Sequence, residues 1–257
     1  MATRSDHELA STLATSAGAL LVEVQAELVA AGVDSQTLKD EGDKRSHDYL
    51  MALLAEHRPN DAVLSEEGPE DGPEGRHNLD RLTADRIWII DPLDGTREFG
   101  EPPRTDWAVH VALVEQGKPT AGAVALPGLN ITLDTAHPPL LPDNAPDAPR
   151  IICSRTRPGP AAELLADVLG GELIYMGSAG AKAMAVVRGE ADIYAHTGGQ
   201  FEWDSCAPVA VAVSAGLHAT RLDGSPLQYN CEDPYLPDLL ICRQELAQPV
   251  LTTLTGF

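Results

Sequence analysis

WIIDPLDGTREF, residues 88–99, runs from an apolar segment into two acidic residues, Asp91 and Asp94, that stand three positions apart. An apolar run that ends at Pro92 is typical of a strand with a rigid exit. Carboxylates at the carboxyl end of a strand lie where open α/β sheets commonly build ligand sites. Clustered oxygen donors without His or Cys favour a hard cation such as Mg²⁺ over zinc.

Gly95 follows this pair directly. A glycine lets the backbone approach a ligand closely, and free N–H groups at the start of a short helix can receive a phosphate oxygen. An ordinary Asp-Gly turn is the alternative interpretation of this dipeptide taken alone.

Charge and length limit the classes of function. The 257 residues suit one large domain or two tightly packed halves. With 18 Lys and Arg against 39 Asp and Glu, the formal charge of -21 repels polyanions. We therefore expect neither a nucleic-acid polymer nor an anionic membrane as a partner.

No basic region precedes an apolar leader, and the apolar segment 17–32 is interrupted by Glu23 and Glu27. This pattern predicts a soluble cytoplasmic protein. The four cysteines are widely spread without a CxxC pair, which favours reduced thiols over zinc ligands or disulfides.

The first half is predicted to be α+β. Apolar residues at i, i+3 and i+4 spacing predict helices, and short alternating runs predict strands. The predicted helices cover 6–31 and 46–59, and the predicted strands lie within 61–67, 86–92, 107–127 and 129–135. A Gly- and Pro-rich charged segment, 68–85, is predicted to be an exposed loop. These elements indicate a largely antiparallel sheet beneath two helices.

The second half is predicted to be α/β. The proline-rich segment 138–149 is the candidate boundary, which gives domains 1–145 and 146–257. After it, strands alternate with helices. The predicted strands are 150–154, 172–177 and 191–195, and the predicted helices are 160–169 and 179–189.

Three further fragments make the chain specific. LSEEG at 64–68 ends a strand with acids, EWDSCAP at 202–208 places Asp204 at a helix start, and GSAGAKAMAVVRGEADIY spans 177–194. Together with WIIDPLDGT they resemble the inositol monophosphatase superfamily of Mg²⁺-dependent, lithium-sensitive phosphatases. The resemblance implies a layered αβαβα sandwich, with an antiparallel sheet in the N-terminal half and a smaller mixed sheet in the C-terminal half.

Aspartyl-phosphate phosphatases of the haloacid dehalogenase type are excluded by spacing. Their DxDGT motif places a nucleophilic Asp two residues before the second Asp, and here that position is Pro92. We expect direct attack by water.

The residues after DGT indicate a branch of the superfamily. DGTREF resembles the DGTKEF of 3'(2'),5'-bisphosphate nucleotidases of the CysQ type, and CSRTRP at 153–158 and DGSPLQYN at 223–230 point the same way. The resemblance implies removal of the 3'-phosphate from 3'-phosphoadenosine 5'-phosphate (PAP), and also from its sulfated form PAPS, in support of sulfate assimilation. Inositol phosphates and fructose 1,6-bisphosphate remain alternative substrates, and a non-catalytic metal- and phosphate-binding regulator is the alternative of another class.

The resemblance also implies a set of metal ligands. Two or three Mg²⁺ ions are expected, with Mn²⁺ able to substitute. Asp91 bridges the ions in this interpretation. The implied ligands are Glu66, Asp91, the Leu93 carbonyl, Asp94 and Asp204.

Catalytic and substrate-binding residues follow by the same resemblance. Thr96, with its hydroxyl oriented by Asp43 or an acidic neighbour, is expected to position the attacking water, and Glu66 joins them as a catalytic residue. The expected substrate-binding residues are Glu66, Leu93, Asp94, Gly95, Thr96, Arg155, Ser178, Lys182 and Asp204. A second phosphate needs further cations, and the available ones are Arg97, Arg155, Arg157 and Lys182.

The remaining expectations are plainer. The eight histidines show no metal-ligand spacing, so residues such as His110 are expected in surface or core roles. His196 is the exception that could lie near the site, because it precedes the Asp204 motif by a few residues. Ser178 is expected to cap a helix as readily as to touch substrate. Family resemblance implies a homodimer.

Overall fold

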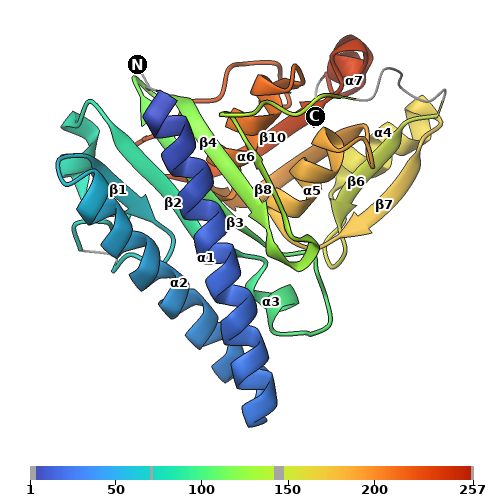
Figure 1. Ribbon diagram of the computed structural model, residues 1–257. Helices are drawn as coiled ribbons and strands as arrows, with labels where there is room; N and C mark the ends of the chain where they lie inside the picture. The colour runs from blue at the N-terminus through green and yellow to red at the C-terminus, as the bar shows by residue number, and fades with distance from the viewer. Residues whose placement is uncertain (1–3, 70–71, 142–147, 256–257) are drawn as a thin grey trace.

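The computed structural model describes residues 4–69, 72–141 and 148–255 (Figure 1). Across these ranges the chain forms two five-stranded sheets separated and flanked by helices. Helices, sheet, helices, sheet and helices follow one another as five layers. The predicted αβαβα sandwich is confirmed.

The first sheet is largely antiparallel. Its strands are β1 (Ala62–Ser65), β2 (Ile87–Asp94), β3 (Ala108–Glu115), β4 (Lys118–Leu126) and β5 (Ile131–Asp134). They lie in sequence order, and only the β1–β2 pair is parallel. Because β1 and β2 are parallel, their carboxyl ends meet at one edge, which brings Glu66 near Asp91.

Helices α1 (Arg4–Ala31) and α2 (Ser35–His57) cover one face of this sheet. The helical stripe of α1 that includes Leu13, Ala17 and Leu21 is buried in the core it forms with the sheet. By length and composition alone α1 could cross a membrane. The core helix of a folded protein can have the same length and composition, and α1 packs one face against the sheet.

α2 begins at Ser35, well before the predicted start at residue 46. Asp34 caps it by accepting a hydrogen bond from Thr37 N at 2.8 Å. The buried stripe of α2 includes Gly42 and Ser46, which carry no apolar signal, so the sequence pattern did not reveal its first turns. The longer helix is what carries Asp43 toward the end of β2.

The second sheet is mixed. Its strands are β6 (Arg150–Ser154), β7 (Glu172–Met176), β8 (Ile193–Phe201), β9 (His218–Thr220) and β10 (Tyr235–Cys242). The order is β7-β6-β8-β10-β9, with β6 parallel to both neighbours and β10 antiparallel to both of its own. α4 (Pro160–Leu169) and α7 (Ala247–Thr253) pack on its outer face. This sheet has as many strands as the first, and the predicted domain boundary at residue 145 falls outside the described residues.

α5 (Ala179–Val187) and α6 (Glu202–Ser214) form the layer between the sheets. Every residue of α5 and most of α6 are buried, because each helix is covered by a sheet on either side. Both helices begin at the edge where β2 ends, since Asp94 contacts Ala179 and lies close to Asp204.

The segment predicted as an exposed loop is partly built into the core. It contains η1 (Leu79–Thr83), whose Arg81 is only 1% exposed. Arg81 donates hydrogen bonds to Asn230 Oδ1 at 2.7 Å and to the Cys231 carbonyl at 2.8 Å. The prediction of exposure is wrong at Arg81 because its partners come from the distant second half. The remaining short elements are α3 (Thr96–Phe99), η2 (Pro127–Leu129) and η3 (Gln244–Leu246).

Candidate functional site

Two carboxylates, Asp91 and Asp94, stand at the end of β2, where the strand becomes irregular. The pairing of β2 with β3 shifts register between Asp91 and Asp94, where Pro92 interrupts the ladder. Leu93 N donates to Asp91 Oδ1 at 3.1 Å, which fixes the Asp91 side chain over its own turn. Both acids are buried.

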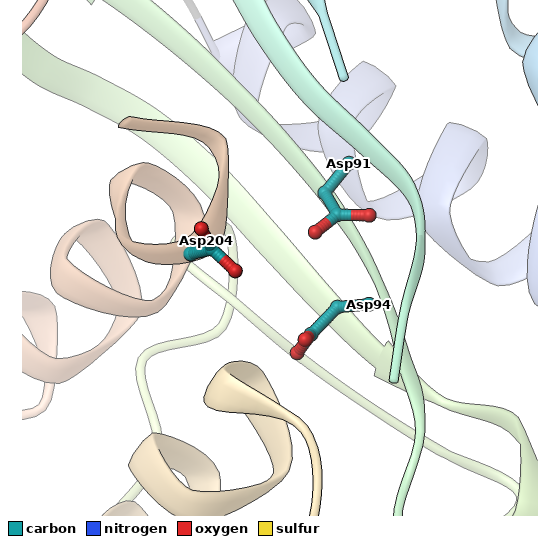
Figure 2. Close-up of side chains that lie close together, drawn as sticks. All are labelled: Asp91, Asp94 and Asp204. Carbon is teal, nitrogen blue, oxygen red and sulfur yellow. The ribbon is translucent and has the colours of Figure 1, made fainter. Parts of the chain in front are cut away.

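Asp204 joins them from the second half of the chain. It lies in the first turn of α6, where its Oδ2 accepts a hydrogen bond from Phe201 N at 2.7 Å. Oxygens of Asp91, Asp94 and Asp204 lie within 4.8 Å of one another, and Figure 2 shows the three side chains facing a common point. Three residues far apart in the sequence thus meet at one place.

Glu66 completes the acidic group from the end of β1: the residue as a whole is exposed, but its carboxyl lies against Asp91 and is largely shielded from water. Removal from bulk water, followed by repulsion from Asp204, raises the pKa of Glu66 to about 8. Burial and the neighbouring Glu66 and Asp94 charges raise the pKa of Asp91 well above its ordinary value. Burial and the charge of Asp94 raise the pKa of Asp204 to about 7.

Such crowding is unfavourable unless positive charge balances it. The donors are carboxylate oxygens only, which suits a hard divalent cation rather than zinc. The chemistry of the site therefore fits the metal that the sequence predicted.

Asp94 differs from its neighbours because groups of the protein compensate its negative charge. Ser178 Oγ and Gly180 N donate hydrogen bonds to Asp94 Oδ2, and Ala179 N donates to Oδ1 at 3.0 Å. These donors are the N-terminus of α5. Burial alone would raise the pKa of Asp94, but the charge of His110 and the hydrogen bond from Ser178 lower it to about 2.

His110, for which the sequence predicts a surface or core role, is a buried partner of Asp94. Its Nε2 lies 3.2 Å from Asp94 Oδ2, and its Nδ1 lies 3.0 Å from the Trp203 carbonyl. Despite burial, the Asp94 charge raises the pKa of His110. A Cβ at Gly180 would lie 2.0 Å from His110 Nε2, so only glycine allows α5 to approach this imidazole.

Thr96 lies where the sequence expected it, beside Asp43. Its Oγ1 is 3.2 Å from Asp43 Oδ1 and 3.0 Å from the Leu93 carbonyl, so its proton can be donated to either oxygen. Burial and the charge of Glu67 raise the pKa of Asp43 to about 7. Gly95, with φ of 86°, turns the chain between Asp94 and Thr96 in a conformation that L side chains rarely adopt.

An open cavity adjoins the acidic group. Its lining combines groups from both halves of the chain. The lining includes Asp94, Gly95, Arg97, Arg155, Arg157, Ser178, Lys182, His196 and Asp204. The structure thus brings the expected substrate-binding residues Gly95, Arg155, Ser178 and Lys182 to the same cavity as two of the acids.

Ser178 caps α5, as one of its two expected roles required. Its Oγ accepts a hydrogen bond from Ala181 N at 2.9 Å while donating to Asp94. Its φ of 51° is unusual for a residue other than glycine. The serine therefore links the start of α5 to the acidic group.

Sequence reasoning missed two groups at this site. His110 faces Asp94 because β3 places it opposite Asp91 in the sheet, a register that the sequence did not give. Glu98 pairs with Arg155 at 2.7 Å, which joins α3 to the segment after β6. The sequence carries a signal for the Glu98–Arg155 pair, because Glu98 lies in DGTREF and Arg155 in CSRTRP, two motifs that indicate the same branch of the superfamily.

Comparison with known proteins agrees with this arrangement. The sequence profile described as inositol monophosphatase family matches residues 4–137 and 152–253. Among solved structures, inositol monophosphatase II of Staphylococcus aureus resembles the fold with a TM-score of 0.77 at 20% identity, covering 97% of this chain and 92% of that one.

Two curated relatives carry more specific names. A 3'-phosphoadenosine 5'-phosphate phosphatase of Mycobacterium bovis is 50% identical over 244 residues, covering 91% of this chain and 87% of that protein. The 3'(2'),5'-bisphosphate nucleotidase CysQ of Escherichia coli K12 is 30% identical over 204 residues, covering 76% of this chain and 80% of that protein.

Proposed function

The chain belongs to the inositol monophosphatase family, and from this membership we propose that it is a metal-dependent phosphatase acting on 3'-phosphoadenosine 5'-phosphate. It removes the 3'-phosphate and releases AMP and phosphate. The observation that carries the proposal is the convergence of Asp91, Asp94 and Asp204 beside an open cavity. The name of the M. bovis relative supports the choice of substrate.

The proposed metal is Mg²⁺, for which Mn²⁺ can substitute. Divalent cations bound here would neutralise phosphate oxygens and activate water. The proposed ligands are Glu66, Asp91, the Leu93 carbonyl, Asp94 and Asp204, a set supported by the burial and mutual repulsion that raise the pKa of three of these carboxyls. The hydrogen bonds from α5 hold Asp94 in one orientation and keep it ionised.

Thr96 and Asp43 are proposed to orient the attacking water. The Thr96 hydroxyl can donate its proton to Asp43 and accept one from water. Because the pKa of Asp43 is about 7, this carboxyl can exchange a proton near neutral pH.

Phosphate release from three substrates tests the proposal. With Mg²⁺ present, we expect the highest kcat/KM on 3'-phosphoadenosine 5'-phosphate, lower values on inositol 1-phosphate and fructose 1,6-bisphosphate, and loss of activity with a chelator. A strong preference for inositol 1-phosphate would overturn the choice of branch. Absence of phosphate release from all three would favour the non-catalytic regulator.

The cellular setting extends the proposal. We propose a soluble, cytoplasmic, lithium-sensitive homodimer that also accepts PAPS and serves sulfate assimilation. The half 1–145 is proposed to carry most of the metal ligands, and the half 146–257 to carry Asp204 and substrate-binding residues. Burial of α1 against the first sheet supports the soluble state. Light scattering of the purified protein measures the oligomeric state, and inhibition by lithium tests the lithium sensitivity.

A further inference from the structure

Four cationic side chains line the cavity that adjoins the acidic group. They are Arg97, Arg155, Arg157 and Lys182. The proposed substrate carries two phosphates, and only one of them reacts. The contacts of the four cations differ, and this difference indicates which of them are available for the non-reacting phosphate.

Arg155 is already engaged. Its guanidinium pairs with Glu98 at 2.7 Å and with Glu101 at 3.3 Å, and Glu98 is itself buried. These carboxylates offset most of the positive charge that Arg155 would offer to a phosphate. Arg155 therefore holds α3 against the segment that follows β6.

Lys182 is engaged as well. Only 5% of its surface is exposed, and its ammonium donates to the Ser178 carbonyl and lies 5.4 Å from the centre of the Tyr194 ring. Its position under the start of α5 places it among the groups that hold Asp94, since Ser178 also donates to that carboxylate. It is not a free cation at the cavity mouth.

Arg97 and Arg157 are different. Both side chains are exposed, and across the described parts of the chain neither has an ion pair or a side-chain hydrogen bond. Arg97 follows Thr96 in the first half, whereas Arg157 follows β6 in the second half. They therefore reach the same cavity from opposite halves of the chain.

We propose that Arg97 and Arg157 bind the non-reacting phosphate of the substrate. This inference rests on the proposed function, because it requires a substrate with two phosphates. Unpaired guanidinium groups bind phosphate oxygens with two parallel hydrogen bonds.

The surrounding charge favours this placement. Asp94, Glu98 and Asp204 are the acidic residues that line the cavity, and the whole chain carries a formal charge of -21. A phosphate without a cation partner is repelled by such surroundings. The two free arginines therefore offer the second phosphate a favourable position within a cavity that is otherwise acidic.

Comparing 3'-phosphoadenosine 5'-phosphate with 3'-AMP tests the inference. Both substrates present the same 3'-phosphate, but 3'-AMP lacks the second one. We expect Arg97→Ala and Arg157→Ala each to lower kcat/KM on the bisphosphate by about ten-fold, the effect of losing a charge-assisted contact. The value on 3'-AMP should fall far less, so the ratio between the two substrates decreases.

Matched variants separate a specific contact from a general change of charge. Lys118→Ala removes an exposed cation outside this cavity and should leave the ratio unchanged. Arg97→Lys should retain part of the preference, because the charge remains and the two parallel hydrogen bonds do not. Arg155→Ala should lower kcat/KM on both substrates by the same factor, since Arg155 acts through Glu98.

Binding of the product provides a readout that does not depend on turnover. Calorimetry should show that AMP binds more tightly than adenosine, and that Arg97→Ala and Arg157→Ala reduce this difference. Equal losses on both substrates, or an unchanged ratio, would overturn the inference while leaving the proposed function intact. A wild-type protein inactive on the bisphosphate would overturn the proposed function, and the inference with it.

Discussion

Asp91 lies in crowded acidic surroundings. It is buried among Glu66, Asp94 and Asp204, and these charges together with burial raise its pKa well above the ordinary value. Asp94 lies in the same group, yet the contacts from His110 and Ser178 lower its pKa to about 2. The pKa values of two carboxyls on one strand thus shift in opposite directions, and the contacts of each residue explain the direction.

Asp91→Asn tests the role of the central acid. The amide keeps the shape of the side chain but removes the negative charge that would hold cations, so we expect turnover to fall on the order of 10³-fold or more. Steady-state phosphate release measures the change. The exposed Asp167→Asn on α4 is the control and should retain wild-type turnover. Near-normal activity of Asp91→Asn would refute the assignment.

The sequence revealed some residues of the site and concealed others. Asp91 and Asp94 could be predicted because they end an apolar strand within a recognisable motif. His110 could not be, because its contact with Asp94 depends on the register that places His110 opposite Asp91. A histidine in an alternating strand has the same pattern whether it faces a core or a carboxylate.

At the scale of elements, the spacing between α2 and α3 positions the Thr96 hydroxyl. Gly42 lies on the buried face of α2, where an added Cβ would lie 2.6 Å from Phe99 Cε1 and 3.0 Å from Leu93 Cδ2. The next residue, Asp43, reaches Thr96. A small residue at position 42 therefore lets the helix come close enough for this contact.

Gly42→Ala should push the two helices apart. Overpacking of this kind costs about 1–3 kcal/mol, and the displaced Asp43 should lower kcat as well. Chemical denaturation and phosphate release measure the two effects. Glu56→Ala, at an exposed position of the same helix, should change the free energy of unfolding by less than about 0.5 kcal/mol. Equal stability of the two variants would contradict the proposed spacing.

The same helix shows why the elements were only partly predictable. Its later turns carry Leu50 and Leu54 on the buried face, and these gave a clear helical pattern. Its earlier turns bury Gly42 and Ser46 instead, because α3 and the Pro92 carbonyl lie close to them. Small and polar residues at a close contact give no apolar periodicity, so the sequence pattern predicts a helix start that is too late.

For the whole molecule, the acidic group makes folding sensitive to pH. Without metal, the folded chain holds protons on Glu66 and Asp204 up to pH about 8 and about 7, whereas the ordinary values are 4.5 and 3.8. The folded state therefore binds more protons than the unfolded state between about pH 4 and 8, and stability falls as pH rises through this window. Asp94, with a pKa of about 2, stays ionised throughout.

Thermal unfolding in a chelator checks this dependence. Because of the acidic group, the melting temperature should fall as the pH rises from 5 to 8. Added Mg²⁺ should raise the melting temperature more at pH 8 than at pH 5. Asp204→Asn removes one of the carboxyls whose pKa is raised and should reduce the slope of melting temperature against pH. Asp167→Asn, at an exposed position, should leave this slope unchanged. A slope identical in Asp204→Asn and wild type would show that other groups cause it.

The layered architecture was predicted from the family resemblance rather than from local patterns. Alternating strands and helices gave the α/β character of the second half, but the strand β10 that pairs with β8 carried no predicted element. The burial of Arg81 was also unpredictable, because its partner Asn230 lies 149 residues away in the sequence. Long-range contacts of this kind come from the packing of the two halves.

The central claim is that carboxylates from distant parts of the chain hold divalent cations at one point. Anomalous diffraction from crystals soaked in Mn²⁺ tests it most directly. The account predicts strong peaks between Asp91, Asp94 and Asp204, with the peak nearest Asp204 lost in Asp204→Asn. Crystals that bind Mn²⁺ elsewhere, or show no peak beside these side chains, would contradict it.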